Sequence, residues 1–148
     1  MPTLFHEYRF KHEIETSPWG DVQACDKLAP GFYLVDTASH GGIMVEEARA
    51  LAELPVEARE CGFHEDGYLC FEEDSAAAVP LRELLDRPDW NPLYSYGCSR
   101  QMLESSVDKT LANVYPAYAA SREKRVKKAK APSPQKAGRE RKSKVPER

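Results

Sequence analysis

Residues 31–43 read GFYLVDTASHGGI, and this stretch decides the fold. Bulky and β-prone side chains run from Phe32 to Thr37, which predicts a buried strand. The strand leads into a small, polar corner at residues 38–42, where paired glycines allow positive φ or a close backbone approach. We expect a turn that leaves the imidazole of His40 at the rim. The candidate functional corner therefore consists of Ser39, His40, Gly41 and Gly42.

Outward from this strand, the chain changes from strand patterns to helix patterns. A period-two alternation over residues 4–14 predicts a strand, and an Asp66-Gly67 turn predicts a hairpin over residues 63–73. Early strands followed by helices are typical of an α+β domain with a small, mainly antiparallel sheet and helices packed on one side. A short strand is expected at residues 21–25, and a short helix at 55–60. Two longer helices are expected at residues 46–54, with Ala48, Leu51, Ala52 and Leu54 inside, and at 76–85, capped by Asp74 and Ser75. The longest helix is expected at residues 99–121, kinked or shortened at Pro116, with Met102, Val107, Leu111, Val114 and Tyr118 on its apolar face.

Charge divides the 148 residues into two parts. Residues 121–148 hold 12 of the 21 basic and 3 of the 24 acidic side chains, which leaves 9 basic and 21 acidic ones in residues 1–120. The acidic domain, 1–120, is thus near −12, and the basic segment, 121–148, is near +9. Because this segment has no aromatic residue and cannot bury much apolar surface, it predicts a disordered tail, or at most a fraying continuation of the last helix.

The four cysteines and the start of the chain indicate a cellular compartment. No CxxC pair occurs, which argues against a zinc finger or ribbon, and the thiols are expected to be reduced core residues. The first residues do not resemble a signal peptide, and no apolar run approaches the length of a membrane span. We expect a cytoplasmic protein that makes no membrane contact.

Two groups of acids suggest an enzyme as an alternative. Glu65 and Asp66, together with residues 72–74 and the imidazoles of His40 and His64, have the donor types that suit a divalent metal ion. Consecutive acids also suit a helix N-terminus, and adjacent Ser39 and His40 point to opposite faces of an extended segment. No phosphate-binding glycine loop occurs. No catalytic residue, metal or cofactor is assigned, and a hydrolase or metal-dependent enzyme at Ser39, His40, Glu72, Glu73 and Asp74 stays an alternative.

Residues 18–80 contain Trp19-Gly20, a T-x-S-H-G-G element over residues 37–42, and a [FY]-E-E-D step over residues 71–74, the acidic step. These motifs resemble those of a group of small uncharacterised proteins from phages, conjugative plasmids and other mobile elements. The resemblance implies an accessory protein of a mobile element, and many such proteins counter host defence. It implies no catalytic role, and it ends before the last helix and the basic tail.

These observations favour a non-enzymatic binding protein, such as an anti-CRISPR or other anti-defence inhibitor. Its acidic surface would dock on a basic surface of a host nuclease, helicase or CRISPR complex. An irregular segment, 90–97, would supply aromatic anchors if exposed, or a loop folded over the core if buried, and a homodimer could also bury it. In another reading the basic tail tethers the protein to DNA. The expected contacts are Glu65, Asp66, Glu72, Glu73, Asp74, Trp90, Tyr94 and Tyr96.

Overall fold

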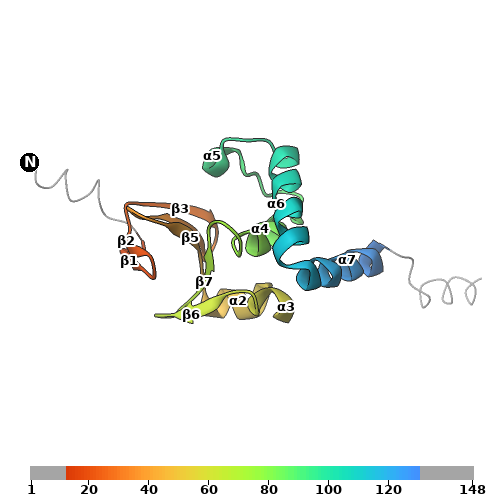
Figure 1. Cartoon of the computed structure of the whole chain (residues 1–148), viewed down its shortest axis with the longest axis horizontal. Coiled ribbons are helices and arrows are strands. Elements are labelled where there is room, and N and C mark those ends of the chain that lie inside the picture. The colour runs from red at the N-terminus through yellow and green to blue at the C-terminus, as the bar shows by residue number, and fades with distance from the viewer. Residues whose placement is uncertain (1–12, 131–148) are drawn as a thin grey trace, which may run out of the picture.

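A five-stranded antiparallel sheet forms one half of the structure. The computed structural model describes residues 13–130, without the side chains of Leu93 and Tyr94. The strand order is β3-β4-β5-β7-β6, and a two-stranded ribbon, β1-β2, precedes the sheet. The predicted α+β class is confirmed, with helices packed on one side of the sheet (Figure 1). The strands are β1 (Thr16–Ser17), β2 (Gly20–Asp21), β3 (Ala24–Ala29), β4 (Phe32–Asp36), β5 (Gly41–Glu46), β6 (Phe63–Glu65) and β7 (Tyr68–Glu72).

The predicted buried strand is β4, the neighbour of the central strand β5, and both of its faces are covered. Phe32 and Leu34 face the helices, whereas Tyr33 and Val35 face the opposite way, because side chains alternate along a strand. The same alternation in β5 and β7 supplies apolar residues to both faces. This is why residues 32–35 are a continuous run of bulky side chains instead of an alternation of polar and apolar ones.

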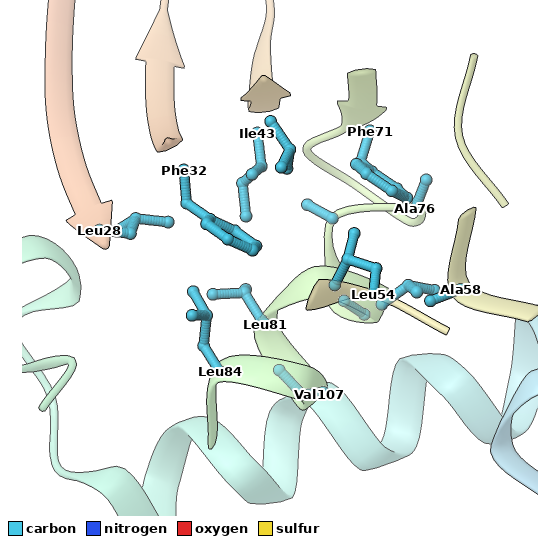
Figure 2. Close-up of a cluster of buried hydrophobic side chains, with 14 of the residues drawn as sticks. Leu28, Phe32, Ile43, Leu54, Ala58, Phe71, Ala76, Leu81, Leu84 and Val107 are labelled. Carbon is cyan, nitrogen blue, oxygen red and sulfur yellow. The ribbon is translucent and has the colours of Figure 1, made fainter. Parts of the chain in front are cut away.

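Helices from the second half of the chain close the core over one face of the sheet. Side chains of β4, β5 and β7 meet those of α4 and α6 in one buried cluster, which includes Phe32, Ile43, Phe71, Leu81, Leu84 and Val107 (Figure 2). The helices are α2 (Glu47–Glu53), α3 (Val56–Arg59), α4 (Ala78–Leu85), α5 (Leu93–Tyr96), α6 (Arg100–Val114) and α7 (Pro116–Lys130).

The inner face of α2 differs from the prediction. Ala50 and Leu54 are buried, whereas Leu51 is 69% exposed. Backbone hydrogen bonds from Glu46 N to Gly31 O (2.9 Å) and from Glu47 N to Gly67 O (3.1 Å) fix the start of this helix. They set its rotation, and the residues that face the core follow at a spacing of four.

The start of α4 also differs from the prediction. Its N-cap is Ala77, and no side chain caps it, so the expected role of Asp74 and Ser75 is wrong. The chain before the helix coils through successive turns, in which Ala77 N donates to Glu72 O (2.8 Å) and Ala78 N donates to Ser75 O (3.1 Å). These backbone acceptors satisfy amides that a side chain would otherwise cap.

The long C-terminal helix breaks at Pro116, as predicted. Ser99 caps α6, its hydroxyl accepting from Met102 N (3.2 Å), and α7 begins at the proline. The apolar face of α6 and α7 is buried at Leu103, Val107, Leu111 and Tyr118, whereas the predicted Met102 and Val114 are exposed.

The structured chain extends past the predicted domain boundary at residue 120. Helix α7 continues to Lys130, so residues 121–130 are helical and the expectation of a disordered tail is wrong for them. The alternative of a helical continuation applies there. The remaining tail, 131–148, and most of the strand predicted over 4–14 lie outside the described residues.

A buried arginine joins α4 to α6. The side chain of Arg82 is 3% exposed, and its guanidinium donates to Asp108 (2.7 Å), Glu104 (2.8 Å) and Asp86 (3.4 Å). Burial acts to lower the pKa of Arg82, but the hydrogen bonds to Asp108 and Glu104 outweigh it and the net pKa is raised. Its charge is therefore retained inside the helical half of the molecule.

The cysteines are free thiols within this fold. Cys70 on β7 is fully buried, as predicted, and burial raises the pKa of its thiol to about 12. The other three cysteines, Cys25, Cys61 and Cys98, are half-buried. Within residues 13–130, no helix combines the length and the apolar character needed to cross a bilayer.

We predict that Arg82→Met lowers the free energy of unfolding by about 2 kcal/mol, because Asp108 and Glu104 lose their shared cation while staying partly hydrated. Urea unfolding followed by circular dichroism measures the change. Arg49→Gln is the control, because Arg49 forms an exposed i,i+4 pair with Glu53 and should leave the midpoint unchanged. Equal midpoints for the two variants would contradict a structural role for the Arg82 cluster.

Candidate functional site

The hydroxyl of Thr37 builds the corner that follows β4. Its Oγ1 accepts from the backbone N–H groups of Ser39 (3.3 Å) and His40 (3.2 Å), and it lies 2.5 Å from His40 O and 3.2 Å from Trp19 O. Thr37 N also donates to His40 O (2.9 Å). Thr37 is buried, whereas Ser39 and His40 are exposed. The corner is thus a turn closed on its own threonine, with the imidazole at the rim as expected.

The paired glycines belong to a strand instead of the turn. Gly41 and Gly42 are the first residues of β5, and neither has a positive φ, so that part of the expectation is wrong. The expected close backbone approach is confirmed. A Cβ on Gly41 would lie 2.4 Å from Val35 O, and one on Gly42 would lie 2.3 Å from Phe71 O and 2.5 Å from Cη2 of Trp19.

The three motif segments meet at this end of the sheet. The indole of Trp19 lies over Gly42, and Gly42 pairs with Glu72 on β7. The next residue, Glu73, donates its N–H to Gly41 O (3.0 Å). Trp19, the corner and the acidic step are therefore neighbours in space although 55 positions of sequence separate Trp19 from Asp74.

An acidic groove opens beside this junction. It has a volume of about 480 Å³ and is lined by carboxylates from β3, β4 and the segment after β7. The register explains the grouping, because Asp26 stands opposite Leu34 and Ala24 stands opposite Asp36 on one face of the sheet. Apolar and aromatic side chains complete the lining. The groove residues used below are Asp26, Asp36, Glu73, Asp74, Leu34, Ala77, Leu81 and Tyr96.

The predicted acidic contacts divide into two separate places. Glu73 and Asp74 line the acidic groove, and Glu72 is exposed next to it. Glu65, the last residue of β6, and Asp66, in the turn that follows, lie at the opposite end of β7 and line a smaller hollow of about 200 Å³ with Glu13 and Glu15. Exposed carboxylates therefore occur at both ends of β7.

The aromatic segment packs mainly on the chain itself. Trp90 is half-buried and its indole N–H donates to Leu28 O (2.7 Å). Tyr96, also half-buried, lines the acidic groove, and burial raises the pKa of its hydroxyl above the ordinary value. The side chain of Tyr94 lies outside the described residues. Since the core covers this segment, burial in a dimer is not needed to explain its aromatic composition.

The enzyme alternative gains little from the geometry. Within residues 13–130, the hydrogen bonds of Ser39 and His40 are made by their backbone groups, and no three His, Cys, Asp or Glu residues are placed to share one metal ion. His64 lies on the edge strand β6, with its Nδ1 2.9 Å from Glu47. The structure thus separates the two histidines that the metal hypothesis combined.

Sequence reasoning missed Asp26 and Asp36. Both are exposed strand residues that share the parity of Leu34, and that parity is the signal that could have placed them on the same face as the acidic step. Their proximity to Glu73 depends on the pairing of β3 with β4 and of β5 with β7, which the local sequence does not specify.

One comparison with known proteins gave a match. A model of the family described as "Domain of unknown function (DUF7007)" matches residues 12–144. No curated protein and no solved structure matches the chain. The matched range covers the sheet, the acidic groove and all of α7, so the family domain continues past the boundary predicted at residue 120.

We predict that Thr37→Val lowers the free energy of unfolding by about 2 kcal/mol, because two backbone N–H groups lose a buried acceptor. Thr37→Ser keeps the hydroxyl and should lower it by less than about 1 kcal/mol. Chemical unfolding of both variants tests this. A Thr37→Ser protein as unstable as Thr37→Val would show that the methyl group, and not the hydroxyl, holds the corner.

Gly42→Ala should lower the free energy of unfolding by about 2–3 kcal/mol, since its Cβ would overlap Phe71 O and the Trp19 ring. Gly67→Ala is the comparison variant. Gly67 has φ +86° but no atom within 4 Å of an added Cβ, so backbone strain alone should cost roughly 1 kcal/mol. Thermal or urea unfolding ranks the two, and a larger loss for Gly67→Ala would refute the packing of Trp19 on Gly42.

Proposed function

We propose a non-enzymatic binding role for this chain, which belongs to the family of the domain of unknown function DUF7007. In this proposal, the acidic groove binds basic side chains of a protein partner. The observation that carries the proposal is the groove itself. It gathers the carboxylates of Asp26, Asp36, Glu73 and Asp74 around a hollow of about 480 Å³.

The charge of the surrounding domain supports this reading. Residues 1–120 are near −12, and several of their few cations are already engaged. Arg82 faces three carboxylates, while Arg49 and Arg87 both pair with Glu53. A basic protein surface is therefore attracted toward this domain, and the attraction raises its association rate.

The lining of the groove favours a side chain over a bare ion. Leu34, Ala77 and Leu81 offer apolar surface for the aliphatic stem of an arginine or lysine, and Tyr96 offers a ring on which a guanidinium can stack. The carboxylates at the rim would then meet the charged head. Arginine fits this combination best, because its planar group both stacks and pairs with carboxylates.

For the partner we propose a host defence protein, in the bacterial cytoplasm, such as a nuclease, a helicase or a component of a CRISPR complex. Such proteins hold nucleic acid on basic surfaces, and an acidic groove competes with phosphates for the same side chains. The resemblance of residues 18–80 to mobile-element proteins supports an anti-defence role. The convergence of the three motif segments next to the groove is consistent with it.

The test uses a fluorescent octa-arginine peptide as a probe of basic surfaces. The double variant Asp36→Asn/Glu73→Gln should bind it about tenfold more weakly, because two charge-assisted contacts are lost. The matched control, Glu65→Gln/Asp66→Asn, removes the same charge at the other end of β7 and should change the affinity less than twofold. Fluorescence polarization at two salt concentrations measures both.

A salt-insensitive affinity, or equal losses in the two double variants, would refute the groove as the binding site. The partner itself is sought by pull-down from a defence-competent bacterial lysate with the wild-type chain and with Asp36→Asn/Glu73→Gln. A nuclease, helicase or CRISPR component retained by the wild type and lost from the variant is the expected result.

A further inference from the structure

Helix α7 carries two kinds of basic side chain with different surroundings. Arg122 donates from Nε to Asp86 (3.0 Å), and Arg125 donates to Glu83 (2.6 Å). Glu83 also accepts from the hydroxyl of the buried Tyr118. These contacts dock α7 on α4. The four lysines of the helix, at 124, 127, 128 and 130, are exposed instead.

Helical spacing places three of the four lysines opposite the docked arginines, and it places Lys128, three residues after Arg125, at the border between the two faces. Tyr118, Arg122 and Arg125 recur at intervals of four and three residues, which is the spacing of one face. Lys124, Lys127 and Lys130 recur every three residues and follow the solvent side. The arginines thus hold α7 against α4, and these contacts determine which way the lysines point.

The exposed face of α7 has a positive charge that the rest of the described chain does not neutralise. Residues 121–130 contain six basic side chains and one acid, and two of the six are the docked arginines, so four lysines remain against Glu123. Between the described residues, no salt bridge within 4 Å involves these lysines. The carboxylates that the arginines of α7 contact, Glu83 of α4 and Asp86 at its C-cap, are already paired with those arginines.

We propose that this lysine face of α7 binds the phosphate backbone of nucleic acid. Lysine makes point-charge contacts that suit phosphates in any sequence, and counterion release drives such binding. A membrane surface fits less well. An interfacial helix buries large apolar side chains, whereas the exposed non-lysine positions of α7 include Ala117, Ala120 and Glu123 before its lysines and Ala129 among them, and Val126 is half-buried. The inner face of α7, with Tyr118, already packs on the hydrophobic core.

This surface is separate from the acidic groove. In Figure 1, α7 extends from α6 on the side of the molecule away from β3, which contributes Ala24 and Asp26 to the groove. The inference therefore goes beyond the proposed function. Nucleic acid on the lysine face would leave the groove open to a basic protein, so a nucleoprotein complex could engage both surfaces at once.

The experiment titrates the full chain into a fluorescein-labelled DNA duplex of about 20 base pairs and arbitrary sequence, at roughly 50 and 200 mM salt. The wild-type chain should bind with strong salt dependence and no preference between two unrelated sequences. Lys124→Gln/Lys127→Gln should weaken binding about tenfold at the lower salt and reduce the slope of log K against log[salt] by about 2. Glutamine is a good helix former, and circular dichroism verifies that the helix is kept.

The matched control is Lys27→Gln/Lys109→Gln, which removes two exposed lysines from β3 and α6. It should change the affinity less than twofold. The proposal is overturned if the wild-type chain does not bind DNA, if Lys124→Gln/Lys127→Gln keeps the wild-type affinity and slope, or if the two double variants lose equally. Binding to vesicles with anionic phosphatidylserine but not to the duplex would also overturn it, in favour of a membrane contact.

Discussion

The packing of the Trp19 indole on the backbone of Gly42 is the contact on which one end of the sheet depends. Gly42 can pair with Glu72 and lie beneath the ring only because it has no side chain. The ring also meets Phe63 of β6 edge to face, at 6.3 Å between centroids. Since Thr37 holds the neighbouring backbone of Trp19 and His40, the ribbon, the corner and the acidic step form one unit. The carboxylates of the acidic groove are positioned by this unit and by the β3–β4 register.

Elements encoded by adjacent residues could be predicted from the sequence. The β6–β7 hairpin forms at Asp66-Gly67, where both residues have positive φ, as such a turn requires. The strand at residues 32–36 and the helix break at Pro116 likewise follow from local sterics and bulk. In each of these cases, a few neighbouring side chains determine the backbone conformation, and tertiary contacts agree with them.

Features that depend on distant partners could not be predicted. Arg82 lies within an apolar helix pattern, and its burial depends on Glu104 and Asp108, more than 20 positions later. The segment after residue 120 has the composition of a disordered tail, yet Arg122 and Arg125 find carboxylates on α4 that stabilise a helix to Lys130. For the same reason, the shared parity of Asp26 and Asp36 was not enough to assign them to the groove, because only strand pairing places them beside Glu73.

The arrangement of charge along the molecule has a consequence for its motion in solution. The acidic groove lies at the sheet, and the lysines of α7 lie beyond α4 and α6 at the other end of the long axis (Figure 1). Carboxylates at the sheet and lysines on α7 contribute an electric dipole along that axis. The field of a charged partner exerts a torque on such a dipole at a distance, so the molecule turns before it touches the partner. In a larger share of collisions, the acidic groove then faces a basic partner, or the lysines of α7 face an acidic one, when the two molecules first touch.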